Sequence, residues 1–257
     1  MTKKKNEKDY WNTFWKNIEY TMSPDELYYM GDTIKLEYVL SFLQGKPPCA
    51  KILEVGCGSA RLSCFLASYG YNIVGLDYSK NALKVAKNNF IQTNNNGEFI
   101  LGDAVHLPFK DGSYDVVMST GLLEHFKNPQ PIVDEMVRLL KSEGLFYSDI
   151  LPSKFSLMRS LDFIGRFIAR KSREFFYENK LKKTDVEHLL QSAGLTNIRV
   201  FAGGVLPPAI LFDRKVPIRR NVRVRIFSWI KPLSKRLDNT WLAEIVGNHY
   251  IAFGSKK

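Results

Sequence analysis

The chain has 257 residues, of which 45% are hydrophobic, and a formal net charge of +11. This length suffices for one α/β domain with insertions, and the hydrophobic share is typical of a globular protein, which excludes a disordered chain. We expect neither a secretory signal nor a membrane-spanning helix, because no apolar stretch follows the charged N-terminus and no run approaches about 18 apolar residues.

The first predicted helix is aromatic. Tyr10, Trp11, Phe14 and Trp15 recur at the spacing of one helix face. Such a face either packs on the core of the domain or covers a ligand site as a lid, and the spacing alone leaves both interpretations open. A second helix is predicted over residues 32–44, and a glycine and two prolines end it.

Residues 51–79 form the most informative stretch. Ile52–Val55 predicts a strand buried on both faces, as in a parallel sheet, and a glycine-containing turn over residues 56–60 follows it. A helix and a second buried strand, over 71–76, come next, and Asp77 follows that strand. This unit predicts half of a nucleotide-binding sheet, with its ligand at the carboxyl ends of the strands. Glycines let the backbone approach that ligand, and the carboxylate can accept from both hydroxyls of a ribose.

Two kinds of glycine motif compete for this turn. The dinucleotide fingerprint G-x-G-x-x-G fails, because Arg61 stands where its third glycine is required. The order E-x-G-x-G, from Glu54 to Gly58, instead resembles the first motif of the class I S-adenosylmethionine-dependent methyltransferases, and Gly75–Leu76–Asp77 resembles their second motif. The third glycine often found in that family is Ala60 here, a mild departure. Within the family, the chain most resembles the small-molecule group called methyltransferase type 11, with ubiquinone- and menaquinone-like enzymes.

The remaining elements continue an alternating α/β pattern. Further strands are predicted over residues 99–101, 114–120, 145–151, 197–201 and 249–255. Further helices are predicted over residues 61–69 and 79–89, from Asn128 to Gly144, and after the capping box Thr184–Glu187. The resemblance implies a single Rossmann-like domain, residues 1–257, with a seven-stranded sheet of order 3-2-1-4-5-7-6, the last strand antiparallel and helices on both faces. The predicted strands are compatible with that order.

The resemblance also implies S-adenosylmethionine as the cofactor. The stretch from Gly102 to Val117 resembles the adenine-side motif and fourth strand of the family, in which the acid matching Asp103 accepts from the adenine amino group. An aspartate at a strand end presents such an acceptor; the alternative is that Asp103 only caps its turn. The residues expected to bind the cofactor are Glu54, Gly56, Cys57, Gly58, Asp77, Tyr78, Asp103, Ala104 and Thr120. Because N-terminal segments often cover the site in this family, we expect residues 10–30 to form a lid.

Two residues after the fourth strand are candidates for acid–base chemistry. A general base would help if the methyl acceptor is a hydroxyl, and His125 follows that strand on the expected substrate side. Glu124 is the second candidate, and the alternative for His125 is that it only packs against the next helix. The three cysteines and four histidines show no metal-ligand spacing, so we expect no metal and a reducing intracellular compartment.

Two predicted insertions carry the basic charge of the chain. Residues 152–181 and 203–247 fall outside the core of the resemblance, and insertions at these places usually build the substrate side in the family. Residues 151–175 have a net charge of +4 and residues 211–240 one of +7, which together equal the charge of the whole chain. Their mixture of apolar residues and arginines fits an amphipathic cover, a surface for anionic lipid head groups or for a hydrophobic substrate with an anionic part, or a nucleic-acid surface.

The expected function is methyl transfer to a small-molecule or lipid-like acceptor by a cytoplasmic enzyme that touches anionic membranes through residues 152–181 and 211–240. An RNA methyltransferase is one alternative, which two absences disfavour. Ser119–Thr120–Gly121 stands where base-amino methylation needs an Asn/Asp-Pro-Pro-aromatic motif, and Pro48–Cys49 comes too early to supply a nucleophile for pyrimidine carbon. The other alternative is a membrane-associated, cofactor-binding partner protein without its own activity.

Overall fold

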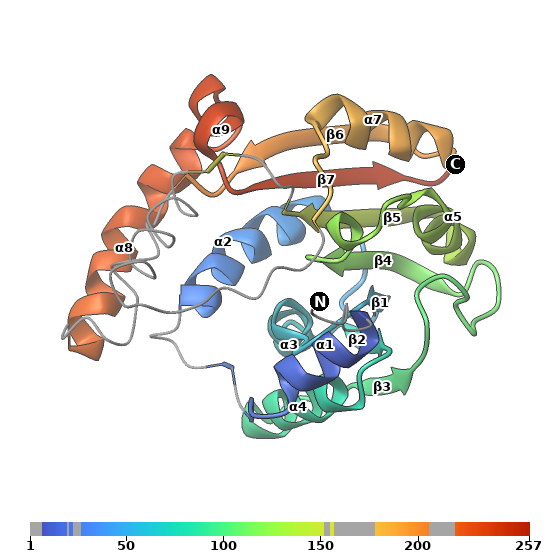
Figure 1. Cartoon of the computed structure of the whole chain (residues 1–257), viewed down its shortest axis with the longest axis horizontal. Helices are drawn as coiled ribbons and strands as arrows, with labels where there is room; N and C mark the ends of the chain where they lie inside the picture. The colour runs from blue at the N-terminus through green and yellow to red at the C-terminus, as the bar shows by residue number, and fades with distance from the viewer. Residues whose placement is uncertain (1–6, 20, 23–26, 152–154, 157–177, 206–218) are drawn as a thin grey trace, which may run out of the picture.

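The fold centres on one seven-stranded sheet (Figure 1). A computed structural model of the chain describes residues 7–19, 21–22, 27–151, 155–156, 178–205 and 219–257. In that part the strands are β1 (Lys51–Val55), β2 (Asn72–Asp77), β3 (Glu98–Leu101), β4 (Tyr114–Thr120), β5 (Leu140–Ile150), β6 (Thr196–Gly203) and β7 (His249–Ser255). Their order is β3-β2-β1-β4-β5-β7-β6, with β1 to β5 parallel and β7 antiparallel to both neighbours. The predicted fold class and strand order are confirmed.

The described helices lie on both faces of this sheet. They are α1 (Glu7–Trp15), α2 (Leu27–Phe42), α3 (Arg61–Ser68), α4 (Lys80–Gln92), the short 3-10 helix η1 (Leu123–His125), α5 (Gln130–Leu139), α7 (Lys183–Ser192), α8 (Arg220–Leu237) and α9 (Trp241–Val246). Most buried apolar residues of α2, α3 and α4 belong to one hydrophobic cluster, and those of α5 and α7 belong to another. Among the described helices, none combines the length and apolar character needed to cross a bilayer.

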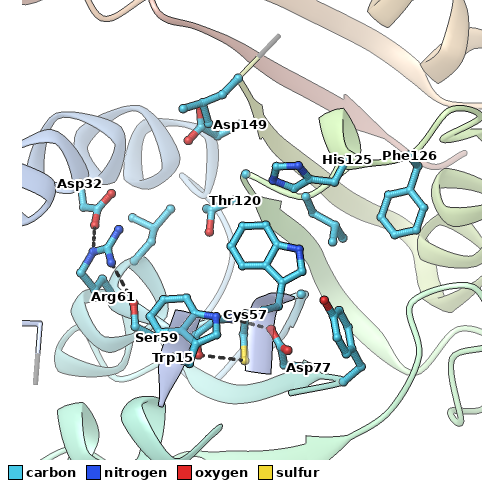
Figure 2. A pocket seen from close by; sticks show the side chains of 18 of the residues that line it. Trp15, Asp32, Cys57, Ser59, Arg61, Asp77, Thr120, His125, Phe126 and Asp149 are labelled. Carbon is cyan, nitrogen blue, oxygen red and sulfur yellow. Dashed lines mark hydrogen bonds and ion pairs between the residues drawn. The ribbon is translucent and has the colours of Figure 1, made fainter. Parts of the chain in front are cut away.

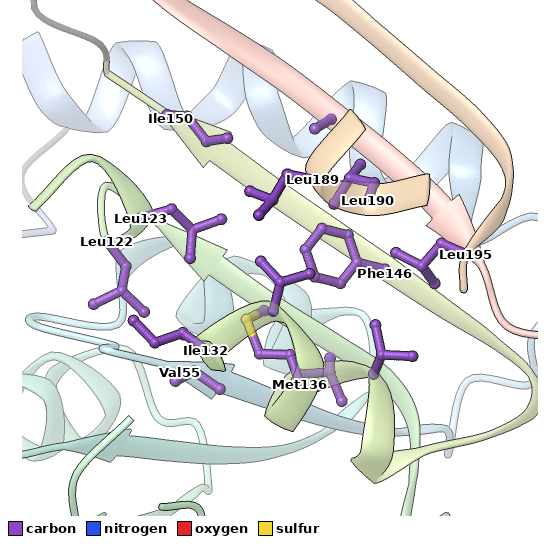
Figure 3. Close-up of a cluster of buried hydrophobic side chains, with 14 of the residues drawn as sticks. Val55, Leu122, Leu123, Ile132, Met136, Phe146, Ile150, Leu189, Leu190 and Leu195 are labelled. Carbon is purple, nitrogen blue, oxygen red and sulfur yellow. The ribbon is translucent and has the colours of Figure 1, made fainter. Parts of the chain in front are cut away.

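The central strands contribute side chains to both clusters, because successive side chains point to opposite faces of the sheet. In β1, Leu53 and Val55 enter the cluster of α5 and α7, whereas Ile52 enters the cluster of α2 to α4. All three side chains are fully buried, as predicted for a strand that is apolar on both faces. Figure 3 shows the cluster of α5 and α7, in which Leu190 of α7 lies beside Phe146 of β5.

The end of α5 differs from the prediction. The helix stops at Leu139 rather than Gly144, and β5 begins directly at Leu140, which pairs with Tyr114 of β4. The register between the two strands then shifts, and Glu143 takes a left-handed φ of 58°. Pairing with β4 therefore satisfies backbone groups that a longer helix would otherwise have satisfied.

The first turns of α7 and α4 show how their sequences start helices. α7 is capped at Lys182, whose backbone N–H donates to the Asp185 carboxylate at 2.8 Å, so the helix begins before the predicted cap at Thr184. α4 starts as predicted, because the Ser79 hydroxyl accepts from the backbone N–H of Ala82 at 3.3 Å.

Both predicted insertions are described only in part. Residues 157–177 and 206–218 lie outside the described residues, as do residues 20 and 23–26 of the predicted lid. The described remainder of the second insertion contains α8 and α9. α8 packs against α2, and α1 packs against α4.

Candidate functional site

A cavity of about 350 Å³ opens where the carboxyl ends of the parallel strands meet (Figure 2). Its volume lies within the range of small-molecule sites, roughly 300–1,000 Å³. The expected cofactor-binding residues that line it are Gly56, Cys57, Gly58, Asp77, Tyr78, Asp103 and Thr120. Glu54 and Ala104 were also expected to bind the cofactor, but they are buried and do not line the cavity. The sheet thus brings together residues from the turns after β1, β2, β3 and β4.

The turn after β1 needs glycine for both conformation and space. Gly56 has a φ of +64°, and a Cβ there would lie 2.6 Å from the Leu122 side chain. Gly58 has a φ of +51°, and a Cβ there would lie 3.0 Å from the Trp15 ring. Ala60, where the family often has glycine, takes the same left-handed region with a φ of 50°, at a cost of about 1–2 kcal/mol. The conformation of the glycine motif is therefore kept without its third glycine.

Asp77 connects the end of β2 to the glycine turn. One carboxylate oxygen accepts from the backbone N–H of Gly58 and the other from that of Ser79, both at 2.8 Å. Burial raises the pKa of Asp77, and these backbone hydrogen bonds act in the opposite direction. Each oxygen of a carboxylate has a second lone pair, so Asp77 can still accept from a ligand in the cavity.

Asp103 both caps its turn and lines the cavity. Its Oδ1 accepts from the backbone N–H of Val105 at 3.2 Å, and its backbone forms an isolated bridge with His106. The two interpretations of this residue are therefore compatible. Ala104, the next residue, packs in the apolar cluster of α5 instead.

Glu54 is a fully buried carboxyl beneath the cavity. It accepts hydrogen bonds from Ser63 Oγ at 2.5 Å and from Thr120 Oγ1 at 2.7 Å, so it ties β1 to α3 and to the end of β4. Burial raises its pKa to about 7, although both hydrogen bonds act to lower it. The arrangement holds Thr120 in place at the cavity wall.

Replacing Glu54 with glutamine should flatten part of the pH dependence of stability. The folded-state pKa of about 7 exceeds the ordinary value of 4.5, so the folded protein holds the Glu54 proton more tightly than the unfolded chain does. This proton contributes its full free energy of unfolding below pH 4.5, and the contribution is lost as the pH rises through 7. Between pH 5 and 8 the wild type should lose about 2 kcal/mol of unfolding free energy relative to Glu54→Gln, measured by urea unfolding. Glu98→Gln, at an exposed position, is the control, and parallel curves for Glu54→Gln and wild type would contradict the prediction.

A chain of charged side chains borders the cavity beside α2 (Figure 2). Lys35 pairs with Asp149 at the end of β5, and its ammonium also lies 3.7 Å from Asp32. Arg61 Nε lies 2.6 Å from an Asp32 oxygen, and its guanidinium donates to Ser59 Oγ at 2.8 Å. Burial acts to lower the pKa of Lys35, but the carboxylates of Asp149 and Asp32 raise it overall.

Asp149 retains one oxygen for a ligand. Its side chain is fully buried and lines the cavity, and Oδ2 pairs with Lys35. Within the described part of the chain, Oδ1 has no hydrogen-bond partner. A buried acceptor without a donor costs about 1–3 kcal/mol, so a donor group on a bound ligand would be stabilised here.

Comparison with known proteins decides the family. Residues 53–148 match the family model described as a methyltransferase domain. Over 168 residues the chain is 30% identical to a ubiquinone biosynthesis O-methyltransferase of Nitrosomonas europaea, a match that covers 63% of this chain and 70% of that relative. The chain belongs to the class I S-adenosylmethionine-dependent methyltransferases.

Further matches agree with this assignment. An uncharacterized methyltransferase of Synechocystis sp. is 34% identical over 167 residues, which is 62% of this methyltransferase and 74% of the relative. A solved structure of a protein from Pyrococcus horikoshii has a TM-score of 0.59 at 20% identity, covering 95% of this chain and 99% of that one. The structural match supports the fold, and the family matches confirm the resemblance of the motifs.

The two candidate acid–base residues of the methyltransferase differ in their access to the cavity. The His125 ring lines the cavity and meets the Trp11 ring edge-on, with the ring centroids 5.0 Å apart. Glu124 is buried and does not line it; one oxygen lies 4.0 Å from His125 Nε2, and Oε2 has no hydrogen-bond partner among the described residues. Burial raises the pKa of Glu124 to about 8. A ligand in the cavity can therefore contact His125, whereas Glu124 is buried behind the residues that line the cavity.

Several cavity residues of the methyltransferase were not predicted. Asp32 and Lys35 stand one turn apart on α2, and their opposite charges at this spacing could have marked them as a pair on one face of the helix. Asp149 ends a parallel strand, so the reasoning applied to Asp77 could have found it. Trp11 and Trp15 of the predicted lid do line the cavity. Among the described residues, no group of three His, Cys, Asp or Glu could hold a metal ion.

Proposed function

We propose that this methyltransferase transfers a methyl group from S-adenosylmethionine to a small-molecule or lipid-like acceptor. The observation that carries the proposal is the cavity around the glycine turn, which Asp77 and Asp103 both line. A side chain at Gly58 would occupy space between the turn and Trp15, so the turn suits a ligand that approaches the backbone. When bound, S-adenosylmethionine supplies a methyl group already activated by a sulfonium.

The order of the strands suggests how the cofactor would be held. Asp103 and Asp77 follow the neighbouring strands β3 and β2, so we assign them to the adenine amino group and the ribose hydroxyls. Asp149 lies at the end of β5, three strands from β2. At about 4.8 Å per strand, the ends of β2 and β5 are separated by roughly 14 Å. Lys35 and Arg61 lie on that side of the cavity and could pair with the carboxylate of the amino-acid part.

The rest of the cavity supports an acceptor that is largely apolar. Leu122, Phe126 and Leu151 line it near His125. We propose that His125 accepts the proton of an acceptor hydroxyl and that Asp149 accepts a hydrogen bond from a polar group of the same molecule. The name of the Nitrosomonas relative describes methyl transfer to oxygen in that protein, which supports a hydroxyl acceptor here. A lipid-like acceptor would also bring the enzyme to a membrane surface, with residues 211–240 as the basic contact.

Binding and product partition together test this proposal. Isothermal titration with S-adenosylhomocysteine should give a dissociation constant on the order of micromolar. With methyl-labelled S-adenosylmethionine, and cell extract separated into organic-soluble metabolites and total RNA, the label should appear in the organic-soluble fraction. Label in RNA would overturn the acceptor class, and binding without any labelled product would favour a non-catalytic partner protein. A folded protein that does not bind S-adenosylhomocysteine would contradict the cofactor assignment.

A further inference from the structure

Among the described residues, α8 packs against the domain through one face. Phe227 and Ser234 are buried on that side, and Lys231 and Lys235 both form ion pairs with Glu37 of α2. Phe227, Lys231 and Lys235 recur every four residues, and Ser234 follows Lys231 by three, so all four share one face of the helix. The described part of the fold therefore contacts this inner face of α8.

The opposite face carries a second apolar row, which we call the outer stripe: Val222, Ile226, Trp229 and Leu233. The spacing of four, three and four residues places them one above another on the helix. The Val222 side chain is 47% exposed, that of Trp229 76% and that of Leu233 50%, whereas Ile226 is half-buried. Single exposed apolar residues are common, but an aligned row is typical of an interaction site.

The charges beside the outer stripe have one sign. From residue 219 to 237 α8 and its N-cap contain seven arginines and lysines and no acid. Lys231 and Lys235 are paired with Glu37, but Arg225 and Arg236 are exposed and form no ion pair with the described residues. Figure 1 shows α9 at one end of α8. Trp241 of α9 is another exposed aromatic residue, with 74% of it accessible.

We propose that the outer stripe docks on the surface of a bilayer that contains anionic lipids. An apolar row with a tryptophan at its centre and arginines beside it is the composition of a helix that lies in the plane of a membrane interface. In this arrangement the Trp229 ring enters the head-group region, and Arg225 and Arg236 face lipid phosphates. The inference locates the membrane contact named under the proposed function, but it stands apart from methyl transfer because vesicle binding needs no methyl donor.

Two other occupants fit the charges less well. A second copy of this chain would pack α8 against α8 about a two-fold axis, which brings Arg225 and Arg236 of both copies to the same interface. A nucleic acid would attract the arginines but would place the outer stripe against polar groups and phosphates. A lipid surface satisfies both the charged and the apolar side chains.

Vesicle flotation with the full chain tests the proposal. The protein should float with vesicles of phosphatidylcholine and phosphatidylglycerol, should not float with phosphatidylcholine alone, and should bind less at high salt. Trp229→Ser combined with Leu233→Ser should weaken binding at least about tenfold. Arg225→Ala combined with Arg236→Ala should weaken it about 25-fold, since each basic residue near an anionic surface contributes about fivefold.

The matched control is Ile91→Ser, which removes an equally exposed side chain (72%) from α4 and should leave binding unchanged. The thermal unfolding midpoint of each variant shows whether it is folded, and the arginine variant provides a second test should the stripe variant unfold. The proposal fails if the wild type does not float with the anionic vesicles, or if both folded variants bind as the wild type does. A concentration-dependent dimer that the stripe variant loses, measured by sedimentation equilibrium, would assign the outer stripe to a second copy instead.

Discussion

Replacing Asp77 with alanine is expected to lower the affinity for S-adenosylhomocysteine by at least about 100-fold, because two hydrogen bonds to a charged group contribute about 1.5–3 kcal/mol each. The carboxylate is assigned to the ribose hydroxyls, and it also accepts from the backbone N–H groups of Gly58 and Ser79. The substitution therefore removes the ligand contact and releases the glycine turn at once. Isothermal titration measures the loss.

Two controls separate these effects. Asp77→Asn keeps the size of the side chain and should lose less affinity, whereas Asp134→Ala changes an exposed acid of α5 and should lose none. 5′-Methylthioadenosine, which lacks the amino-acid part, should respond to Asp77→Ala in the same way, because it retains the ribose. Wild-type affinity of Asp77→Ala for both compounds would show that the ribose assignment is wrong.

Replacing Lys35 with methionine should lower the free energy of unfolding by about 3–5 kcal/mol, the usual effect of removing one partner of a buried ion pair. The substitution removes the ion pair of Lys35 with Asp149 Oδ2, and Oδ1 has no hydrogen-bond partner among the described residues. A fully buried carboxylate would then be left without its cationic partner. Urea unfolding of the protein without ligand measures the difference.

An exposed ion pair provides the control for this second result. Lys141 pairs with Asp115 at 2.8 Å, but the Lys141 side chain is 46% exposed, so Lys141→Met should cost less than about 1 kcal/mol. Adding Asp149→Asn to Lys35→Met should restore part of the lost stability, because the carboxamide carries no charge. Equal losses in the free energy of unfolding for Lys35→Met and Lys141→Met would mean that the buried Lys35 pair stabilises the fold no more than an exposed pair does.

The fold could be predicted where local pattern and tertiary pairing agree. β1 and β4 are short apolar runs bounded by turn residues, and the structure places both in the centre of the sheet. The end of α5 could not be found in this way. Residues 140–144 continue a helical pattern, and only the pairing of Leu140 with Tyr114, distant in sequence, draws them into β5.

The site divides along the same line. Gly56, Gly58 and Asp77 lie in one strand–turn–helix–strand unit, so their spacing alone predicts that they meet. Lys35 and Asp149 are 114 residues apart, and no periodicity in either segment indicates that they pair. Trp11 and His125, whose rings are in contact, are also far apart in the sequence. The expectation of a lid over residues 10–30 did not say which residue of the site Trp11 would contact.

The position of β7 has a consequence for how the protein is made. β5 and β6 are never neighbours; each pairs instead with residues 249–255, which are translated after both of them. Until that last strand emerges from the ribosome, β5 has an open edge and β6 has no partner, and unpaired strand edges are prone to aggregation. Strands β1 to β5, with the cavity, can assemble during synthesis, whereas β6 gains its partner only after residues 249–255 have been translated.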